Sequence, residues 1–298
     1  MIDRRLRVIA VPVMAIVATV AVATSAAAQS TPWGDPDLQG TWTSSGATPM
    51  ERPDDLQGRE LLTDEEVSSI RARTTARDLE LLNAPAQRTE VSTNPGAYNN
   101  FWMDRGARTN RTSMIVDPPD GKFPPLTPTG EWHSETQLKA PGGAEKDDTW
   151  EDRHIWERCV TRGGMPNAMF PRSYNNNMQV FQAPGVVVML IEQVHEVRVV
   201  PLDGRPQVSD KITQWNGLSR GHWEGDTLVV ETTGFSERHS YRGSTTDRNL
   251  VERFTRVDAD TLLYEFTMTD PATWTAPWTA RIPMRWNELP LFEYACHE

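Results

Sequence analysis

The sequence predicts a mainly β protein organised as a single antiparallel β-barrel. From residue 178 onward the chain is a succession of short strand-like runs separated by turn residues. The runs at 261–269 and 278–286 alternate large apolar residues with polar ones, as strands with one buried face do. Between two further apolar runs, Glu224-Gly225-Asp226 has the composition of a tight hairpin turn. Many short strands at this spacing are typical of a barrel or a sandwich.

The N-terminus has the three parts of a cleavable signal peptide, expected at residues 1–28. Arg4, Arg5 and Arg7 precede an apolar run from Val8 to Val22, and Ala26-Ala27-Ala28 offers a small-residue cleavage site. The apolar run is short for a membrane anchor. We therefore expect export to the periplasm or beyond, with no membrane attachment after cleavage.

The remaining residues are expected to form one domain. Residues 29–157 would supply a first strand, an N-terminal helix and a long irregular arm, and residues 158–298 would form the barrel core. Thr63 and Glu66 have the spacing of a capping box, which predicts a helix that ends near Leu82. The proline-rich segment 117–128 is expected to wrap over the surface of the barrel.

The expected strands of the barrel follow one another with short connections. Turn residues such as Pro184-Gly185 and Asp203-Gly204 separate several of them. The expected strands are Met178–Gln182, Val186–Glu192, Val194–Val200, Ile212–Trp215, Gly221–Trp223, Thr227–Thr232, Leu250–Arg256, Thr261–Thr269, Trp278–Trp286 and Leu291–His297.

The chain contains two cysteines, Cys159 and Cys296. In an exported protein we expect them to form a disulfide, which would close a long loop. Two buried free thiols are an alternative, and a catalytic cysteine is a third.

The composition narrows the class of partner. The formal net charge is −11 and the sequence has no basic runs, which argues against a nucleic-acid partner. The chain also has eleven tryptophans. Most are expected in the core, but indole rings also suit sugars and aromatic ligands. The expected partner is a small molecule, and the sequence indicates no oligomeric state.

Several segments resemble a family of secreted bacterial β-rich proteins known mainly as uncharacterised sequences. That resemblance implies an exported β-rich domain and implies no particular activity. In addition, Gly40-Thr41-Trp42 resembles the Gly-x-Trp signature of the first strand in lipocalin-like barrels, where the tryptophan plugs the closed end. It implies a lipocalin- or calycin-like barrel. The segments that carry the family resemblance are 158–162, 174–177, 194–204, 223–232, 250–256 and 293–298.

Candidate catalytic residues lie close together near the second barrel strand. Glu192, His195 and Arg198 offer a carboxylate, an imidazole that can move a proton near neutral pH, and a guanidinium that can stabilise negative charge. In a regular strand, Glu196 and Arg198 share the face opposite His195. The alternative is therefore an outward Glu196–Arg198 pair with His195 inside the barrel.

A further carboxylate, Glu252, lies on the same face of its strand as Leu250 and Phe254. If that face is interior, the charge needs a partner or a function, so Glu252 is the fourth catalytic candidate.

Other residues are candidates for ligand contact rather than catalysis. Arg105, Arg108 and Arg111 lie close in sequence and offer either an anion contact or ordinary surface charge. The candidate ligand-binding residues are Arg105, Asn176, Arg220, His222, Trp223 and His297.

Three functions remain open from the sequence. No histidine pair has metal-ligand spacing, and the chain has no nucleophile elbow and no dinucleotide or phosphate-loop motif, so no metal or cofactor is expected. The first hypothesis is a cofactor-independent lyase, hydrolase or isomerase that uses acid–base residues in a barrel cavity on a small oxygenated, aromatic or sugar-derived substrate. The alternatives are a non-catalytic lipocalin-like binding protein and a module that binds a partner or matrix. The barrel interior discriminates among them, because a filled barrel favours the last.

Overall fold

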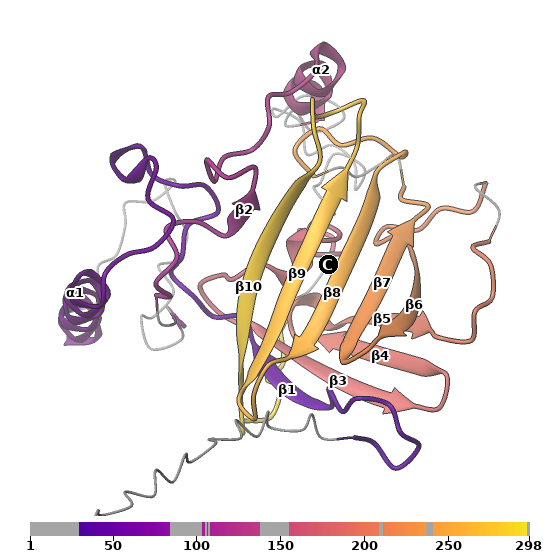
Figure 1. Ribbon diagram of the computed structural model, residues 1–298, viewed down its shortest axis with the longest axis horizontal. Coiled ribbons are helices and arrows are strands. Elements are labelled where there is room, and N and C mark those ends of the chain that lie inside the picture. The colour runs from indigo at the N-terminus through magenta and orange to yellow at the C-terminus, as the bar shows by residue number, and fades with distance from the viewer. Residues whose placement is uncertain are drawn as a thin grey trace, which may run out of the picture.

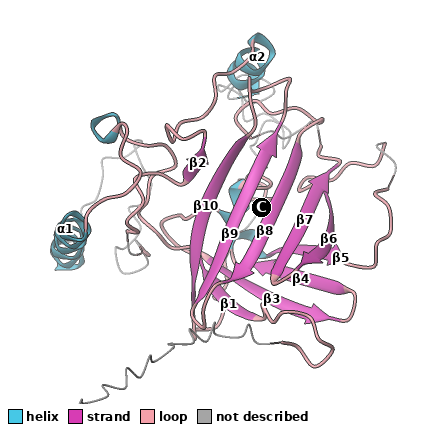
Figure 2. Cartoon of the chain, viewed as in Figure 1, coloured by secondary structure: helices cyan, strands magenta, loops and turns pink. Residues whose placement is uncertain are grey.

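The computed structural model describes residues 30–83, 103–104, 106, 108–137, 155–208, 211–236 and 241–296. Strands account for most of the regular structure in these residues (Figure 2). The helices are α1 (Asp64–Asn83) and α2 (Pro128–Gln137). The strands are β1 (Gly40–Thr43), β2 (Ile115–Asp117), β3 (Asn177–Ala183), β4 (Val186–Ile191), β5 (Glu196–Pro201), β6 (Leu218–Glu224), β7 (Thr227–Thr233), β8 (Asn249–Arg256), β9 (Thr261–Thr269) and β10 (Trp278–Trp286).

The strands form one antiparallel sheet that curls into a nearly closed barrel, as predicted (Figure 1). Their order is β5-β4-β3-β1-β10-β9-β8-β7-β6, and β2 pairs with β10 beside this path. The predicted hairpin is confirmed: β6 and β7 pair in register from Glu224 opposite Thr227 to Leu218 opposite Thr233. Strand β1 lies between β3 and β10, so the N-terminal part of the chain completes the barrel wall.

The barrel closes where β5 and β6 come together. At this seam, a Cβ added to Gly221 of β6 would lie 2.8 Å from a methyl carbon of Val200 on β5 and 2.7 Å from one of Leu202. A larger side chain would therefore require Val200 and Leu202 to move. Gly221 therefore lets the two edge strands approach closely.

Side chains fill the barrel interior. The alternation predicted for β9 and β10 is confirmed, because Tyr264, Phe266, Trp278 and their in-phase neighbours as far as Met284 are fully or nearly fully buried. Trp286, the last in-phase residue of β10, is exposed. The ring centroids of Tyr264 and Phe266 are 5.5 Å apart, and those of Phe266 and Trp278 are 5.2 Å apart. Trp42 is also fully buried, and its indole nitrogen donates a hydrogen bond to the Leu38 carbonyl oxygen. The interior is therefore a packed aromatic core.

Three details of the strand prediction are wrong. Residues 212–215 and 291–296 are not strands. The predicted strand start at Val194 is also wrong, because Val194 and His195 have φ of 57° and 43° within a short 3-10 turn, Gln193–His195. A positive φ is unusual for these residue types, so nothing local in the sequence marks this turn. Strand β5 therefore begins at Glu196.

The capping-box helix and the proline-rich segment are both present. The Glu66 amide donates to the Thr63 hydroxyl (3.3 Å) and the Thr63 amide donates to the Glu66 carboxylate (2.8 Å), so α1 begins as predicted. The proline-rich segment packs on the barrel through Phe123, whose ring centroid lies 4.8 Å from that of Trp278. Helix α1 stands beside the barrel, and α2 lies at one of its ends (Figure 1).

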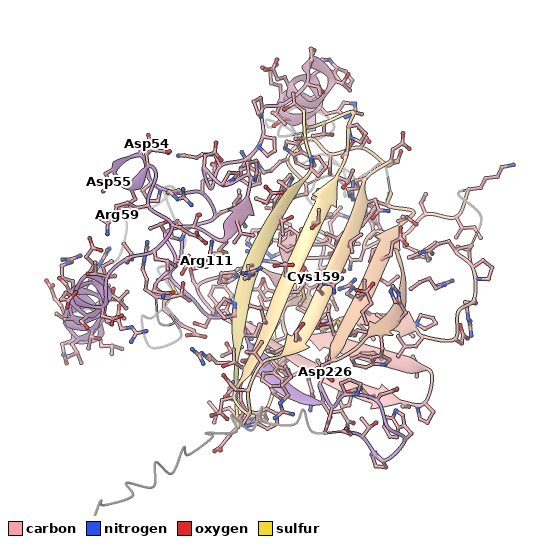
Figure 3. All side chains as sticks on the ribbon, viewed as in Figure 1. Asp54, Asp55, Arg59, Arg111, Cys159 and Asp226 are labelled. Atoms are coloured by element: carbon pink, nitrogen blue, oxygen red, sulfur yellow. A yellow bond between two sulfur atoms is a disulfide. The ribbon has the colours of Figure 1, made fainter. Side chains whose placement is uncertain are left out.

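Ion pairs stabilise the chain between α1 and the barrel. Arg59 pairs with Glu66 on α1 at 2.6 Å, and Arg111 pairs with Glu60 at 2.9 Å. Figure 3 shows Arg59 and Arg111 in this region.

Candidate functional site

Two of the predicted catalytic residues, Arg198 and Glu252, meet inside the barrel. Arg198 donates from Nη2 to Glu252 Oε2 at 2.6 Å and from Nη1 to Oε1 at 3.1 Å. Nη2 also donates to the hydroxyls of Ser219 (3.1 Å) and Thr232 (3.2 Å), and the Tyr264 hydroxyl donates to Glu252 at 2.9 Å. The cluster joins β5, β6, β7, β8 and β9 across the seam.

The electrostatics of this cluster are those of a compensated ion pair. Arg198 is 4 % exposed and Glu252 is fully buried. Desolvation lowers the pKa of Arg198, but the charge and hydrogen bonds of Glu252 outweigh it and raise that pKa overall. Burial, and then the neighbouring Glu252 charge, raise the pKa of Tyr264. A charge-paired, fully packed cluster of this kind organises the core.

The other two predicted catalytic residues lie elsewhere. Glu192 is 3 % exposed and accepts hydrogen bonds from the Asn177 amide (3.2 Å), the Asn177 side chain (2.8 Å) and the Phe292 amide (2.7 Å). His195 is exposed. The structure therefore does not bring the four candidates together. The alternative of an interior His195 with an outward Glu196–Arg198 pair is wrong, because Glu196 and Arg198 are both buried.

Glu196 holds the loop that follows Cys159 against the end of the barrel. Its carboxylate accepts hydrogen bonds from the Thr161 hydroxyl, the Arg162 amide (2.7 Å) and the Asn216 side chain (3.2 Å). Burial raises the pKa of this carboxyl, and the hydrogen bonds only partly offset that rise.

We expect Glu196 to make stability depend on pH. Because its folded-state pKa is raised above the unfolded value of about 4.5, its contribution is fully present below that value and is lost as pH rises through the raised pKa. Relative to Glu196→Gln, the wild type should lose unfolding free energy over this window, which urea denaturation between pH 4 and 8 would measure. Glu231→Gln, at an exposed carboxylate, should keep the wild-type profile. An unchanged profile in Glu196→Gln would contradict the assignment.

The predicted ligand-binding residues are scattered. Asn176 is buried, where its side chain contacts Arg172 and Asp104. His222 is exposed and pairs with Glu224 at 3.2 Å. Of the rest, Arg220 and Trp223 are half-buried on β6, and Arg105 and His297 lie outside the described residues, as does the predicted signal peptide.

The predicted disulfide between Cys159 and Cys296 is confirmed, with a Cα–Cα distance of 5.8 Å. Figure 3 places Cys159 behind the barrel strands. The bond ties the loop after residue 155 to the C-terminal segment, and it is consistent with an exported protein. Neither of the described helices has the length and apolar character needed to span a bilayer.

A large groove lies on the outer face of the barrel, with a volume of about 1570 Å³. The residues of β10 that point away from the core, Arg281, Pro283 and Arg285, contribute to its floor. Its other walls are the end of β1 with the segment that follows it, one face of α1, the described part of 103–111, the segment 171–177 and the C-terminal segment 286–296.

Aromatic side chains form one side of this groove. Tyr174 and Tyr294 are stacked with ring centroids 6.3 Å apart, and the Trp156 indole nitrogen donates to the Tyr294 hydroxyl at 3.0 Å. Trp286 is 39 % exposed and Phe292 is 56 % exposed. These rings present apolar faces along one side of the groove.

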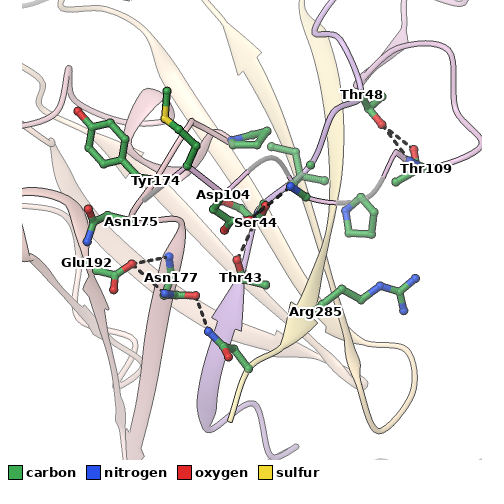
Figure 4. Close-up of a pocket in the computed structure, with 18 of the residues that line it drawn as sticks. Thr43, Ser44, Thr48, Asp104, Thr109, Tyr174, Asn175, Asn177, Glu192 and Arg285 are labelled. Atoms are coloured by element: carbon green, nitrogen blue, oxygen red, sulfur yellow. Dashed lines mark hydrogen bonds between the residues drawn. The ribbon is translucent and has the colours of Figure 1, made fainter. Parts of the chain in front are cut away.

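Hydroxyl and amide groups line the rest of the groove. Thr48 and Thr109 share a hydrogen bond of 2.8 Å, and Asp104 accepts one from the Ser45 hydroxyl at 2.6 Å. Figure 4 shows Tyr174, Asn175, Glu192 and Asn177 at one side of the groove, Thr43, Ser44 and Asp104 in the middle, and Thr48 and Thr109 at the other side.

Sequence reasoning missed this groove as a site. Its lining comes from segments far apart in the chain, most of them irregular, and no motif marks them. Two sequence features do contribute to it, the polar segment 174–177 and the arginines at 108 and 111. Tyr174, Asn175, Asn177 and both arginines line the groove.

Comparison of the chain with protein-family models, with characterised proteins and with solved structures gave no match.

Proposed function

We propose that this protein is an exported binding protein, periplasmic or secreted, that takes an oligosaccharide in the outer groove. The observation that supports the proposal is where the structure leaves room for a ligand. Aromatic side chains and a paired ionic cluster fill the barrel interior, whereas the outer groove has about 1570 Å³. That volume exceeds the few hundred to about 1000 Å³ of a typical small-molecule pocket and suits an elongated ligand.

The chemistry of the lining supports a sugar chain. Aromatic rings stack on the apolar faces of sugar rings, and Trp286 and Phe292 are exposed enough to do so. Threonine, serine and asparagine side chains offer both donors and acceptors to sugar hydroxyls. The groove combines the two kinds of group, with the aromatic rings on one side and many of the hydroxyl and amide groups on the rest of its lining.

The geometry favours binding over catalysis. Two carboxylates that line the groove, those of Asp104 and Glu192, accept hydrogen bonds from Ser45, Asn177 and the Phe292 amide. The histidine proposed as a general base, His195, does not line the groove. These carboxylates hold the walls in place, which suits a rigid binding surface.

A bulky side chain placed in the groove tests the proposal. Ser68 is exposed on α1 and lines the groove, so Ser68→Trp puts an indole into the space for the ligand. We expect at least about a tenfold loss of affinity for oligosaccharides that the wild type binds on a glycan array, because the indole clashes with the bound chain. Isothermal titration calorimetry would measure it.

The neighbouring residue provides the matched control. Ser69 is exposed on the same helix but does not line the groove, so Ser69→Trp should bind as the wild type does. Equal affinity of Ser68→Trp and Ser69→Trp would place binding elsewhere. A wild-type protein that binds no oligosaccharide on the array would overturn the proposed function.

A further inference from the structure

We infer that the groove selects an acidic oligosaccharide, whose carboxylate or sulfate binds a pair of arginines, Arg71 and Arg108. This inference rests on the proposed function and adds the class of sugar. The two residues come from different parts of the chain, α1 and the segment after residue 106, and both line the groove. An Arg71 guanidinium nitrogen donates to the Arg108 carbonyl oxygen at 3.1 Å, so the two arginines are held next to each other.

Arg108 carries a positive charge and has a hydrogen-bond donor that no described residue satisfies. Its Nη1 donates to the Ala47 carbonyl oxygen at 3.2 Å, and its Nε is buried without a hydrogen-bond partner in the described structure. Desolvation lowers the pKa of Arg108, and no neighbouring carboxylate offsets that cost. A buried donor without a partner is costly, and an anionic ligand would satisfy it.

Other arginines of the groove already have partners. Arg281 pairs with Glu265, and Arg111 pairs with Glu60. Arg285 donates to the Thr261 hydroxyl at 2.7 Å. Among the described residues that line the groove, Arg285 therefore keeps an uncompensated charge by itself, whereas Arg71 and Arg108 place two such charges next to each other.

The groove also contains acidic residues, whose positions matter for the binding of an anion. Asp104 accepts hydrogen bonds from Ser45, from the Gly106 amide and from Asn176, which disperse its charge. Asp64, at the start of α1, also lines the groove. In a chain of net charge −11, the arginine pair is the feature that attracts an anion, because guanidinium groups bind carboxylates and sulfates with charge-assisted hydrogen bonds.

The experiment compares one sugar chain with and without its charge. The probes are hexagalacturonate, its fully methyl-esterified form and a carrageenan hexasaccharide, which carries sulfate but no carboxylate, titrated into the full-length mature protein. The wild type should bind an acidic probe more tightly than the neutral ester. In Arg108→Met that preference should fall by about tenfold or more, because one or two charge-assisted hydrogen bonds are lost. Carboxylate and sulfate probes separate the two sources of the anion.

Arg253→Met is the control, because it removes an exposed arginine that pairs with Glu224 and does not line the groove. It should change affinity for the acidic probe by no more than about twofold. Equal binding of acidic and neutral forms by the wild type, or an unchanged preference in Arg108→Met, would overturn the inference and leave the proposed function standing. Failure of every probe and of the glycan array would overturn both.

Discussion

Replacing Arg198 by methionine should lower the free energy of unfolding by about 3 to 5 kcal/mol. The substitution leaves the Glu252 carboxylate fully buried, and among the described residues the Tyr264 hydroxyl is then its only side-chain hydrogen-bond partner. An uncompensated charge in a packed core is far more costly than the loss of the attraction itself. Urea denaturation at neutral pH, followed by circular dichroism, would measure the change as a lower midpoint.

The neighbouring exposed ion pair provides the matched control. Arg253 is next to Glu252 in sequence but points outward, where it pairs with Glu224 at 2.9 Å and remains 39 % exposed. Arg253→Met should cost no more than about 1 kcal/mol, as is usual for surface pairs. Similar losses of unfolding free energy in Arg198→Met and Arg253→Met would show that the buried ion pair matters no more for stability than the exposed one.

A combined variant separates the loss of charge pairing from the loss of packing. In Arg198→Met with Glu252→Leu and Tyr264→Phe, no charge and no unpaired hydroxyl remains from these three residues. Ser219 and Thr232 still bond to each other at 2.9 Å. We expect this variant to recover most of the stability, because apolar replacements of buried ion pairs are often neutral or stabilising. A triple variant as unstable as Arg198→Met would contradict the electrostatic explanation.

Removal of the disulfide should have the second largest effect. Cys159 and Cys296 are 137 residues apart, so the bond restricts a long loop in the unfolded chain. The variant with both cysteines replaced by alanine should lose about 2 to 5 kcal/mol, measured by denaturation under non-reducing conditions. Its ligand affinity should also fall, because the bond anchors the C-terminal segment that forms the aromatic side of the groove.

Two comparisons isolate the contribution of the bond. Tyr294→Phe removes the hydroxyl that accepts a hydrogen bond from Trp156 and leaves the disulfide intact. That variant should lose only about 1 kcal/mol, the usual contribution of one hydrogen bond. Reducing agent should destabilise the wild type and leave the alanine variant unchanged, and an equal response of both proteins would contradict the assignment.

Much of the barrel could be predicted from local patterns. Alternation over 261–269 and 278–286 identified β9 and β10 and their buried faces, because side chains of a strand point to its two sides in turn. The β6–β7 hairpin followed from its turn residues, and the disulfide followed from the expectation of export. The strand prediction failed at 194–195, where a turn with positive φ lies among ordinary residues. It also failed at 212–215 and at 291–296, which are not strands.

The sequence by itself indicated most of the strand pattern, placed Glu252 on the same strand face as Leu250 and Phe254, and led us to expect that the two cysteines pair. Only the tertiary structure decided that Arg198 faces Glu252 inside the barrel, that His195 is exposed, and that the available space lies outside the barrel. The physical reason is the range of the interactions. Alternation and turn chemistry act over a few residues, whereas the groove arises from contacts between α1, β1, β10 and the C-terminal segment, which no local pattern encodes.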